Sequence, residues 1–295
     1  MRSFRNIRTI AAAVLLAVIA FSRIGYAQNK GHLVIIGGGE RTDEIMQKFI
    51  ELAGGKNATI VVFPMASSVA EEVGSDQARQ IKKLGVKESF YLNITADAAN
   101  QDSTVGKLAN VTGVFYSGGD QVLLTAALLN TKVQKRINEI YKNGGVVGGT
   151  SAGAAVMSKI MLTGNELINK DSTASFFSLL KDNIEVKEGF GFITEAIIDQ
   201  HFVVRRRHNR LISVVLQNPA LVGVGIDEAT SIIVNPDRTF DVLGESVVVV
   251  YDATHSKHVR TNKNKYLSAY NMSMHILQSG DSYNLKSKKV AINKR

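Results

Sequence analysis

The chain has 295 residues, of which 45 % are hydrophobic and 21 % are charged, with 25 glycines, 3 prolines and no cysteine. This composition is typical of a globular protein with a large apolar core, and it excludes a disordered chain, a collagen-like chain and a disulfide scaffold. The absence of cysteine excludes thiol nucleophiles and zinc–thiolate sites, whereas the formal net charge of +9 does not say where the charge lies.

Residues 1–27 have the three-part layout of a secretory signal peptide. Three arginines precede an apolar run over 10–21, and small residues stand close to Ala27. The alternative is a membrane anchor, but the run is shorter than the roughly 20 residues that cross a bilayer. We therefore expect cleavage near Ala27, export to the periplasm or the outside of the cell, and no integral membrane span in the mature chain.

From residue 32 onwards, short apolar runs rich in β-branched residues alternate with longer amphipathic stretches, as in parallel strands joined by helices. The expected strands cover 32–36, 59–63, about 88–92, 113–116 and 145–148. The expected helices cover 42–53, 70–84, 121–129 and 133–143. Near-continuous apolar strands are typical of a sheet that is covered on both faces, where ligands bind at the carboxyl ends of the strands.

The second half of the chain is richer in β-structure. A helix is expected after Ser151, a surface loop over 163–188, a strand at 196–198 and a helix over about 203–217. Four β-rich segments and an edge strand follow at 221–226, 231–234, 239–242, 247–251 and 272–277. The prediction is an α/β domain over 28–253, with a mostly parallel sheet between helices and a β-rich C-terminal part. Residues 254–295 form a basic extension that packs on this domain or continues it.

A candidate nucleophile lies between a predicted strand and a predicted helix. Residues 149–153 fit the pattern G-x-S-x-G, in which a sharp strand-to-helix turn exposes the hydroxyl of Ser151 above the sheet. Small residues at such a turn can also be purely structural. The interpretation as a nucleophile therefore needs a base, because a serine hydroxyl reacts only when its proton is removed.

Histidine is the usual base near neutral pH, and the chain has six histidines. Three of them lie in the polar tail and His32 begins the first strand, which leaves His201 and His208. His201 follows the strand at 196–198 and so falls at a carboxyl strand end, where Ser151 is also expected. His208 lies in an arginine-rich helix, where a solvated or packed role is expected.

Two glycine-rich loops follow predicted strands. The loop over 117–121 can supply the amide of Gly119, which with that of Ala152 would form an oxyanion hole; the alternative is an ordinary turn. The loop over 37–40 lacks the G-x-G-x-x-G pattern, with Arg41 in place of the third glycine, so we reject a nucleotide site there.

An arginine-rich run at 205–210 follows His201 closely. On a helix, Arg207 and Arg210 would share a face with Arg205 near its edge, so that several guanidinium groups converge beside the nucleophile. Arginine binds carboxylates in a planar, bidentate way. The alternative is a solvated basic face or a phosphate-binding patch.

These motifs together resemble the cyanophycinase branch of the serine peptidase family that also contains peptidase E, an aspartyl dipeptidase. The resemblance rests on residues 118–121, 149–157, 199–202 with the three arginines at 205, 207 and 210, and 225–228. It covers the chain from about residue 31 to 251, and the order and spacing of the motifs make it far more specific than G-x-S-x-G alone. The chain departs from the family in its leader and in the long 163–188 segment.

The resemblance implies a flavodoxin-like fold, similar to that of class I glutamine amidotransferases, and a homodimer. It implies hydrolysis of cyanophycin, a polyaspartate carrying arginine on each side-chain carboxylate, to β-Asp-Arg dipeptides. Ser151 would be the nucleophile and His201 its base, with no cofactor and no metal. The implied substrate-binding residues are Gln121, Asp199, Gln200, Arg205, Arg207 and Arg210.

The carboxylate that orients His201 is the least certain member of the site. Glu166 lies 15 residues after Ser151, in a position that resembles the acid of peptidase E, and it is slightly favoured. Glu228 belongs to the family pattern and is the alternative. Asp171 is a weaker third choice because its surroundings are polar and loop-like.

The charge lies mainly at the two ends of the chain. Residues 28–253 carry 22 basic and 25 acidic side chains, whereas 254–295 carry nine basic ones and a single acidic one. We therefore expect no nucleic-acid partner. The alternatives to a cyanophycin hydrolase are a dipeptidase similar to peptidase E, or a secreted binding protein that has lost its catalysis.

Overall fold

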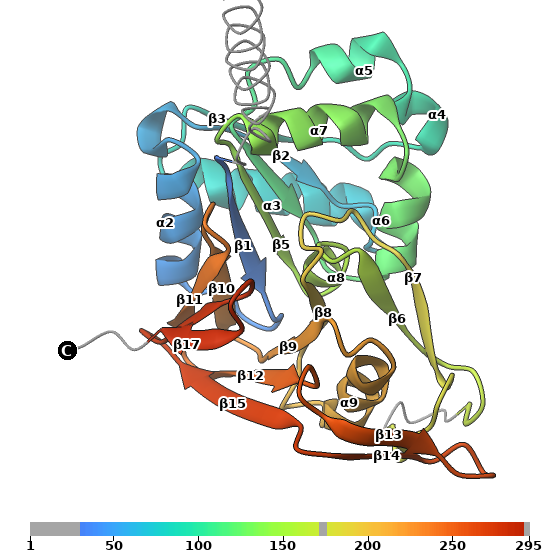
Figure 1. Ribbon diagram of the computed structural model, residues 1–295. Helices are drawn as coiled ribbons and strands as arrows, with labels where there is room; N and C mark the ends of the chain where they lie inside the picture. Colours follow the sequence, from blue (N-terminus) through green and yellow to red (C-terminus); the bar gives the residue numbers. More distant parts are fainter. Residues whose placement is uncertain (1–29, 171–175, 292–295) are drawn as a thin grey trace, which may run out of the picture.

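The computed structural model describes residues 30–170 and 176–291 (Figure 1). The predicted signal peptide and its cleavage near Ala27 lie outside the described residues, as does Asp171. Within the described ranges, no helix combines the length and the apolar character needed to cross a membrane.

A nine-stranded sheet forms the centre of the molecule. Five parallel strands stand side by side in the order β1, β5, β4, β2, β3; their bounds are β1 (His32–Ile36), β2 (Thr59–Phe63), β3 (Glu88–Tyr91), β4 (Gly113–Tyr116) and β5 (Val146–Thr150). Beyond β1 the sheet continues with antiparallel strands, namely β10 (Thr230–Val234), β11 (Thr239–Gly244), β16 (Ser282–Asn284) and β17 (Lys289–Ala291). The prediction of an α/β fold is confirmed, and the antiparallel half of this sheet is built from part of the β-rich C-terminal region.

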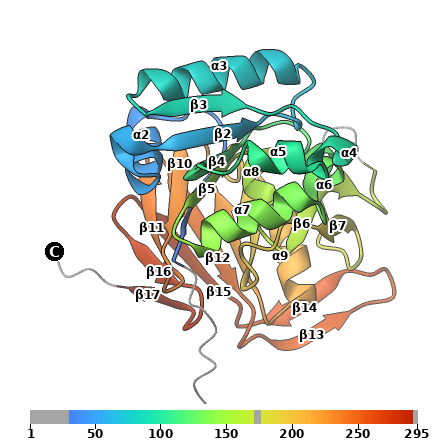
Figure 2. The same ribbon diagram turned by 90° about the horizontal axis from the view of Figure 1, so that it is seen from above.

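Helices cover both faces of the parallel half, as Figure 2 shows from above. The side chains of α2 (Asp43–Leu52) and α3 (Ala70–Lys83) pack on one face. The other face carries α6 (Gln121–Leu128), α7 (Lys132–Lys142) and the one-turn helix α8 (Ala152–Ala155), with α4 (Ala96–Ala99) and α5 (Asp102–Gly106) beside them. Every residue of β2, β4 and β5 is therefore buried, which explains their apolar sequences. A short 3₁₀ helix, η1 (Gly55–Asn57), leads from α2 into β2.

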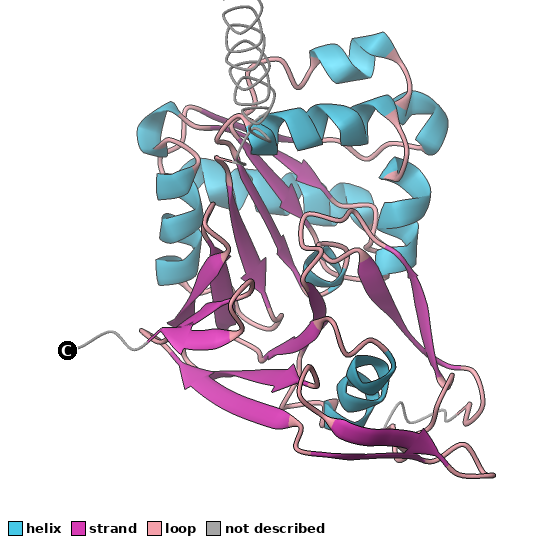
Figure 3. Cartoon of the chain, viewed as in Figure 1, coloured by secondary structure: helices cyan, strands magenta, loops and turns pink. Residues whose placement is uncertain are grey.

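A second, four-stranded sheet lies below the first in the view of Figure 3, where all strands are drawn in magenta. Its order is β15 (Ser273–Gln278), β12 (Val247–Asp252), β9 (Val222–Ile226) and β8 (Ala196–Gln200), and α9 (His208–Gln217) packs against it. Only β8 and β9 run parallel in this sheet, so their carboxyl ends lie side by side and the residues that follow them are neighbours. This pairing brings two distant parts of the sequence together.

The segment over 163–188, predicted as a surface loop, has strands at its two ends, whereas the described residues between them, 167–170 and 176–183, form no strand. Strands β6 (Ile160–Glu166) and β7 (Ile184–Glu188) pair antiparallel, with a shift in register between Leu162 and Glu166. Three of the five residues of β7 are exposed. A strand with one solvated side carries polar residues, which is why its sequence has the character of a loop.

The helix predicted from about residue 203 begins only at His208. His201 and Arg206 have φ values of 48° and 53°, and a helix cannot continue through the left-handed region. The amides of Val203 and Val204 instead both donate to Asp227 Oδ1 at 3.0 Å. Arg205 and Arg207 therefore belong to a turn and do not share a helix face with Arg210.

Residues after 253 add strands to both sheets. Strand β15 pairs with β12, and β16 pairs with β11, while β13 (Lys257–Thr261) and β14 (Leu267–Tyr270) form a separate two-stranded ribbon. Leu277, Tyr283 and Leu285 from this part are buried in the main core. The extension thus contributes to the same core as the rest of the described chain.

Candidate active site

Ser151 occupies a sharp turn between β5 and α8. Its φ and ψ are 55° and −111°, a strained combination for a residue with a side chain. A Cβ on Gly149 would lie 2.4 Å from the carbonyl oxygen of Gly153, and one on Gly153 would lie 2.2 Å from that of Tyr116. Glycine is therefore required on both sides of the serine, because the chain passes too close to itself for any side chain.

His201 leaves β8 at the same edge and faces the serine. Its amide donates to the carbonyl oxygen of Gly37 at 2.7 Å, and its Nε2 lies 2.8 Å from Ser151 Oγ. Burial lowers the pKa of His201 from 6.5, and the charges of Arg205 and Arg207 lower it further. The hydrogen bond to Glu228 raises the pKa but does not cancel these effects. The imidazole is therefore neutral near pH 7, as a general base must be.

Glu228 contacts the other nitrogen of this imidazole. It follows β9, and its Oε1 lies 2.5 Å from His201 Nδ1. The preceding residue, Asp227, is buried and accepts a hydrogen bond from Ser246 Oγ at 2.8 Å, besides those of the turn after His201. The position of Glu228 is thus determined by the same buried carboxylate that orders the chain after the histidine.

Glu166 lies elsewhere, so the preference for it as the partner of His201 is corrected. It is buried in β6, and its Oε1 accepts a hydrogen bond from Asn183 Nδ2 at 2.6 Å. Strand β6 pairs only with β7 in its sheet, whereas β9 pairs directly with β8. The structure therefore pairs His201 with Glu228, the second of the two candidates.

The residues expected to form an oxyanion hole border the serine. A Cβ built on Gly118 would lie 3.3 Å from Ser151 Cβ, which brings the loop after β4 against the nucleophile. Gly119 in this loop has a φ of 134°. Ala152 begins α8 directly after the serine, and the amides of Ala154 and Ala155 donate to the carbonyl oxygen of Ser151.

The glycines after β1 also lie against this site, although no role in it was expected for them. A Cβ on Gly38 would lie 2.2 Å from His201 Cε1, and one on Gly39 would lie 3.0 Å from Glu228 Oε2. This loop, residues 37–39, therefore covers the histidine and the glutamate. Three consecutive glycines after a buried strand are the signal that could have indicated a close approach.

Most of the side chains expected to bind substrate are engaged with one another. Arg210 Nε donates to Asp199 Oδ2 at 2.7 Å and Nη2 makes a second, shorter bond to Oδ1, while the guanidinium lies over the Phe176 ring. Arg207 Nη1 donates to the carbonyl oxygen and to Oε1 of Gln200, at 2.8 and 2.6 Å. Of the three arginines only Arg205 is exposed.

Desolvation affects Arg207 strongly. Burial, and then the charge of Arg210, lower its pKa to about 9, although Asp199 at 3.9 Å opposes the shift. Its Nε is buried without a hydrogen-bond partner among the described residues. Arg207 and Arg210 are therefore two desolvated guanidinium groups bonded to Gln200 and Asp199 at the end of β8.

Gln121 connects two elements at the edge of the site. Its Nε2 donates to the carbonyl oxygens of Leu162 and Thr163, at 2.7 and 2.8 Å. These bonds fix the first turn of α6 to β6. In the described part of the chain, no three histidine, aspartate or glutamate side chains lie close enough to hold a metal ion.

An α/β fold with an activated serine at the end of a central strand is the arrangement of a serine hydrolase, and the comparisons identify the class. The profile of Peptidase family S51 matches residues 33–242, and the chain belongs to this family. The cyanophycinase of Synechococcus elongatus is 34 % identical over 276 residues, which cover 90 % of this chain and 82 % of that protein. The cyanophycinase of Geminocystis herdmanii (strain PCC 6308) is 32 % identical over 266 residues, which cover 88 % of this chain and 95 % of that protein.

A solved structure shows the same fold. A peptidase from an acI-B1 Actinobacterium superposes with a TM-score of 0.64 over 88 % of this chain and 98 % of its own, at 22 % sequence identity. The family resemblance drawn from the sequence motifs is confirmed. The chain is thus a serine-type peptidase of family S51.

Proposed function

We propose that this protein is an exported peptidase that hydrolyses cyanophycin to β-Asp-Arg dipeptides, with Ser151, His201 and Glu228 as its catalytic triad. The observation that carries the proposal is the line of hydrogen bonds from Ser151 Oγ through both nitrogens of His201 to Glu228. The likeness to two cyanophycinases over nine-tenths of the chain supports the choice of substrate.

In the proposed mechanism, His201 Nε2 removes the proton of Ser151 Oγ as the oxygen attacks the scissile carbonyl carbon. Glu228 accepts the hydrogen bond of Nδ1–H, which fixes the tautomer and stabilises the imidazolium. The amides of Gly119 and Ala152 would bind the oxyanion. The imidazolium then protonates the leaving amine, and water, deprotonated by His201, hydrolyses the acyl-enzyme.

The pocket is proposed to use the arginines for the carboxylates of the substrate. Arg205 is the exposed member and can reach a ligand directly. Arg207 and Arg210 would act mainly by holding Gln200 and Asp199 in place. Export rests on the leader at residues 1–27, and the homodimer rests on the family resemblance alone.

The test is to incubate the purified protein, beginning at residue 28, with insoluble cyanophycin. Clearing of the suspension with release of β-Asp-Arg supports the proposal. Cleavage of dipeptides with an N-terminal aspartate but not of the polymer would favour an activity like that of peptidase E, and no turnover of either would favour a binding protein. Ser151→Ala should abolish turnover while leaving the circular dichroism spectrum unchanged. A variant that kept full activity would contradict the nucleophile.

A further inference from the structure

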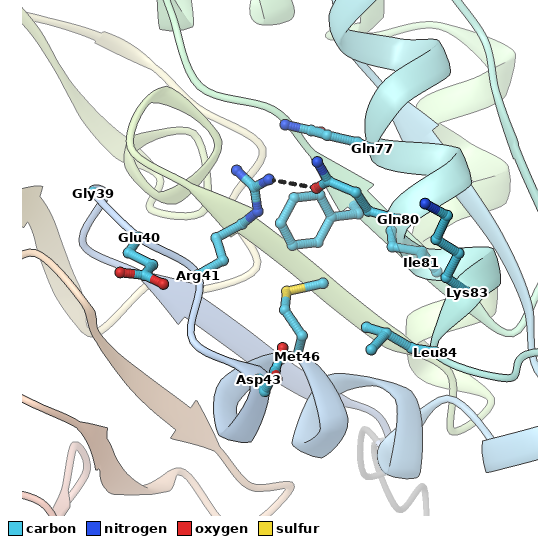
Figure 4. A pocket seen from close by; sticks show the side chains of 11 residues that line it. Gly39, Glu40, Arg41, Asp43, Met46, Gln77, Gln80, Ile81, Lys83 and Leu84 are labelled. Carbon is cyan, nitrogen blue, oxygen red and sulfur yellow. Dashed lines mark hydrogen bonds between the residues drawn. The ribbon is translucent and has the colours of Figure 1, made fainter.

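A cavity of about 440 Å³ lies on the far side of the loop that covers His201 (Figure 4). It is lined by residues 39–41, by the first turn of α2 and by the C-terminal half of α3. Phe115 of β4 and Met46 form part of its lining. None of these groups has a role in the mechanism proposed above.

The cavity and the active site share their walls. Gly39 lines the cavity, and it is also the residue whose Cβ would lie 3.0 Å from Glu228 Oε2. Gln77 lines the cavity from α3, and its Oε1 accepts a hydrogen bond from Ser117 Oγ at 2.6 Å, directly before the loop beside Ser151. Gly39 and Gln77 thus place the cavity next to the active site.

Arg41 projects into the cavity without a carboxylate partner. Its Nη2 donates to Gln80 Oε1 at 3.0 Å, and no ion pair among the described residues includes it. Figure 4 shows the Glu40 carboxylate directed away from it. Burial lowers the pKa of Arg41, with no carboxylate to oppose the shift. A half-buried guanidinium that keeps free donors is suited to a planar anion such as a carboxylate.

The lining carries both signs of charge. Glu40, Asp43 and Lys83 are exposed at the rim, while Arg41 is half-buried. In cyanophycin each arginine is attached through its α-amino group, so every unit presents a free α-carboxylate together with a guanidinium. A ligand of this kind matches the cavity better than a simple anion does, because it also offers a cation to the carboxylates of Glu40 and Asp43.

We propose that Arg41, held by Gln80, binds the α-carboxylate of an arginine in a polymer unit next to the one being cleaved. This inference rests on the proposed function, and it adds a subsite that would favour the polymer over single dipeptide units. Residues 39–41 would then link recognition of the neighbouring unit to the loop that covers His201 and Glu228.

The test measures binding in the Ser151→Ala background, so that no substrate is consumed. Titration calorimetry compares Ser151→Ala with Ser151→Ala/Arg41→Gln, using soluble cyanophycin fragments and the same fragments with argininamide in place of arginine. We expect Arg41→Gln to weaken binding of the natural fragments about tenfold, as for loss of a charge-assisted hydrogen bond. Binding of the amidated fragments should change less than twofold.

Arg79→Gln is the matched control, because Arg79 precedes Gln80 in α3 but pairs with Asp76 at 2.5 Å on the surface. If Arg41→Gln lowers the affinity for natural and amidated fragments equally, or lowers neither, the proposed subsite is wrong. If the wild-type protein cleaves cyanophycin and Arg41→Gln binds it normally, only the subsite is wrong. If the wild-type protein neither binds nor cleaves the polymer, the proposed function fails and the subsite fails with it.

Discussion

At the scale of single residues, the imidazole of His201 joins two polar groups through its opposite nitrogens. Nε2 meets the hydroxyl of Ser151 at 2.8 Å, and Nδ1 meets the carboxylate of Glu228 at 2.5 Å. The ring is held between them because its own amide is bonded to Gly37 and the glycine loop lies against its edge. A ring fixed in this way needs little reorganisation when it takes a proton.

Replacing the carboxylate beside His201 tests its role directly. Glu228→Gln should lower kcat about 10³- to 10⁴-fold, because an amide can donate to Nδ1 and select the wrong tautomer. Glu166→Gln is the matched control, since Glu166 is bonded to Asn183, and its kcat should stay within about threefold of the wild type. The opposite ranking in steady-state assays would restore Glu166 as the catalytic acid.

The pH dependence of kcat/KM should report the titration of His201. Only the neutral imidazole acts as a base, so activity rises with pH through a pKa that burial holds below 6.5. The charge of Arg205 contributes to that lowering, and Arg205→Gln should therefore raise the pKa and move the acid limb to higher pH. Arg206→Gln, also exposed, is the control. A limb that stays in place or moves to lower pH would contradict this electrostatic account.

At the scale of elements, the ion pair between Asp199 and Arg210 fastens α9 to β8. Both side chains are about 1 % exposed, and the amide of Gln200 also donates to Asp199 Oδ1 at 2.7 Å. A buried pair contributes little net stability compared with apolar residues, but removing one partner leaves an isolated charge in the interior. The pair therefore determines where the turn between β8 and α9 lies.

Arg210→Met should lower the free energy of unfolding by about 3–5 kcal/mol, because Asp199 is left buried and unpaired. The double variant Asp199→Asn/Arg210→Met should recover part of that loss. Urea denaturation followed by circular dichroism measures both, with Arg206→Met as an exposed control expected to stay within about 0.5 kcal/mol of the wild type. A double variant less stable than the sum of its single changes would argue against the buried-charge explanation.

At the scale of the whole molecule, two sheets meet so that the ends of β5, β8 and β9 converge. Residues 254–291 strengthen this arrangement, because β15 extends the second sheet and β16 extends the first. Their buried side chains join the main core. The basic tail is thus a structural part of the hydrolase, although its sequence is polar.

A chain ending at residue 253 should lose at least about 5 kcal/mol of unfolding free energy. It would lack Leu277, Tyr283 and Leu285, which are 4 %, 0 % and 1 % exposed, and a fully buried apolar side chain contributes roughly 1.5–3 kcal/mol. The urea midpoint, or recovery in the insoluble fraction, measures the effect. A chain ending at residue 291 is the control, and equal midpoints for the two would show that the extension is not part of the core.

The fold could be predicted well where a signal is local. The runs at 32–36, 59–63 and 113–116 are strands with the predicted bounds, because strands buried on both faces are apolar throughout. The pairing of β6 with β7 and the start of α9 at His208 were not predicted. Strand β7 is mostly exposed, and the start of α9 depends on Asp227, which is distant in sequence.

The class of fold, the serine turn and the histidine could be predicted from the sequence alone, because glycine spacing and strand ends are local properties. The carboxylate that meets His201 became known only from the arrangement of the strands in space. Glu166 and Glu228 both lie at the end of a strand, and the choice depends on which strands are neighbours: β9 runs parallel to β8, whereas β6 pairs with β7. Strand order is a contact between distant segments, and no spacing along the chain encodes it.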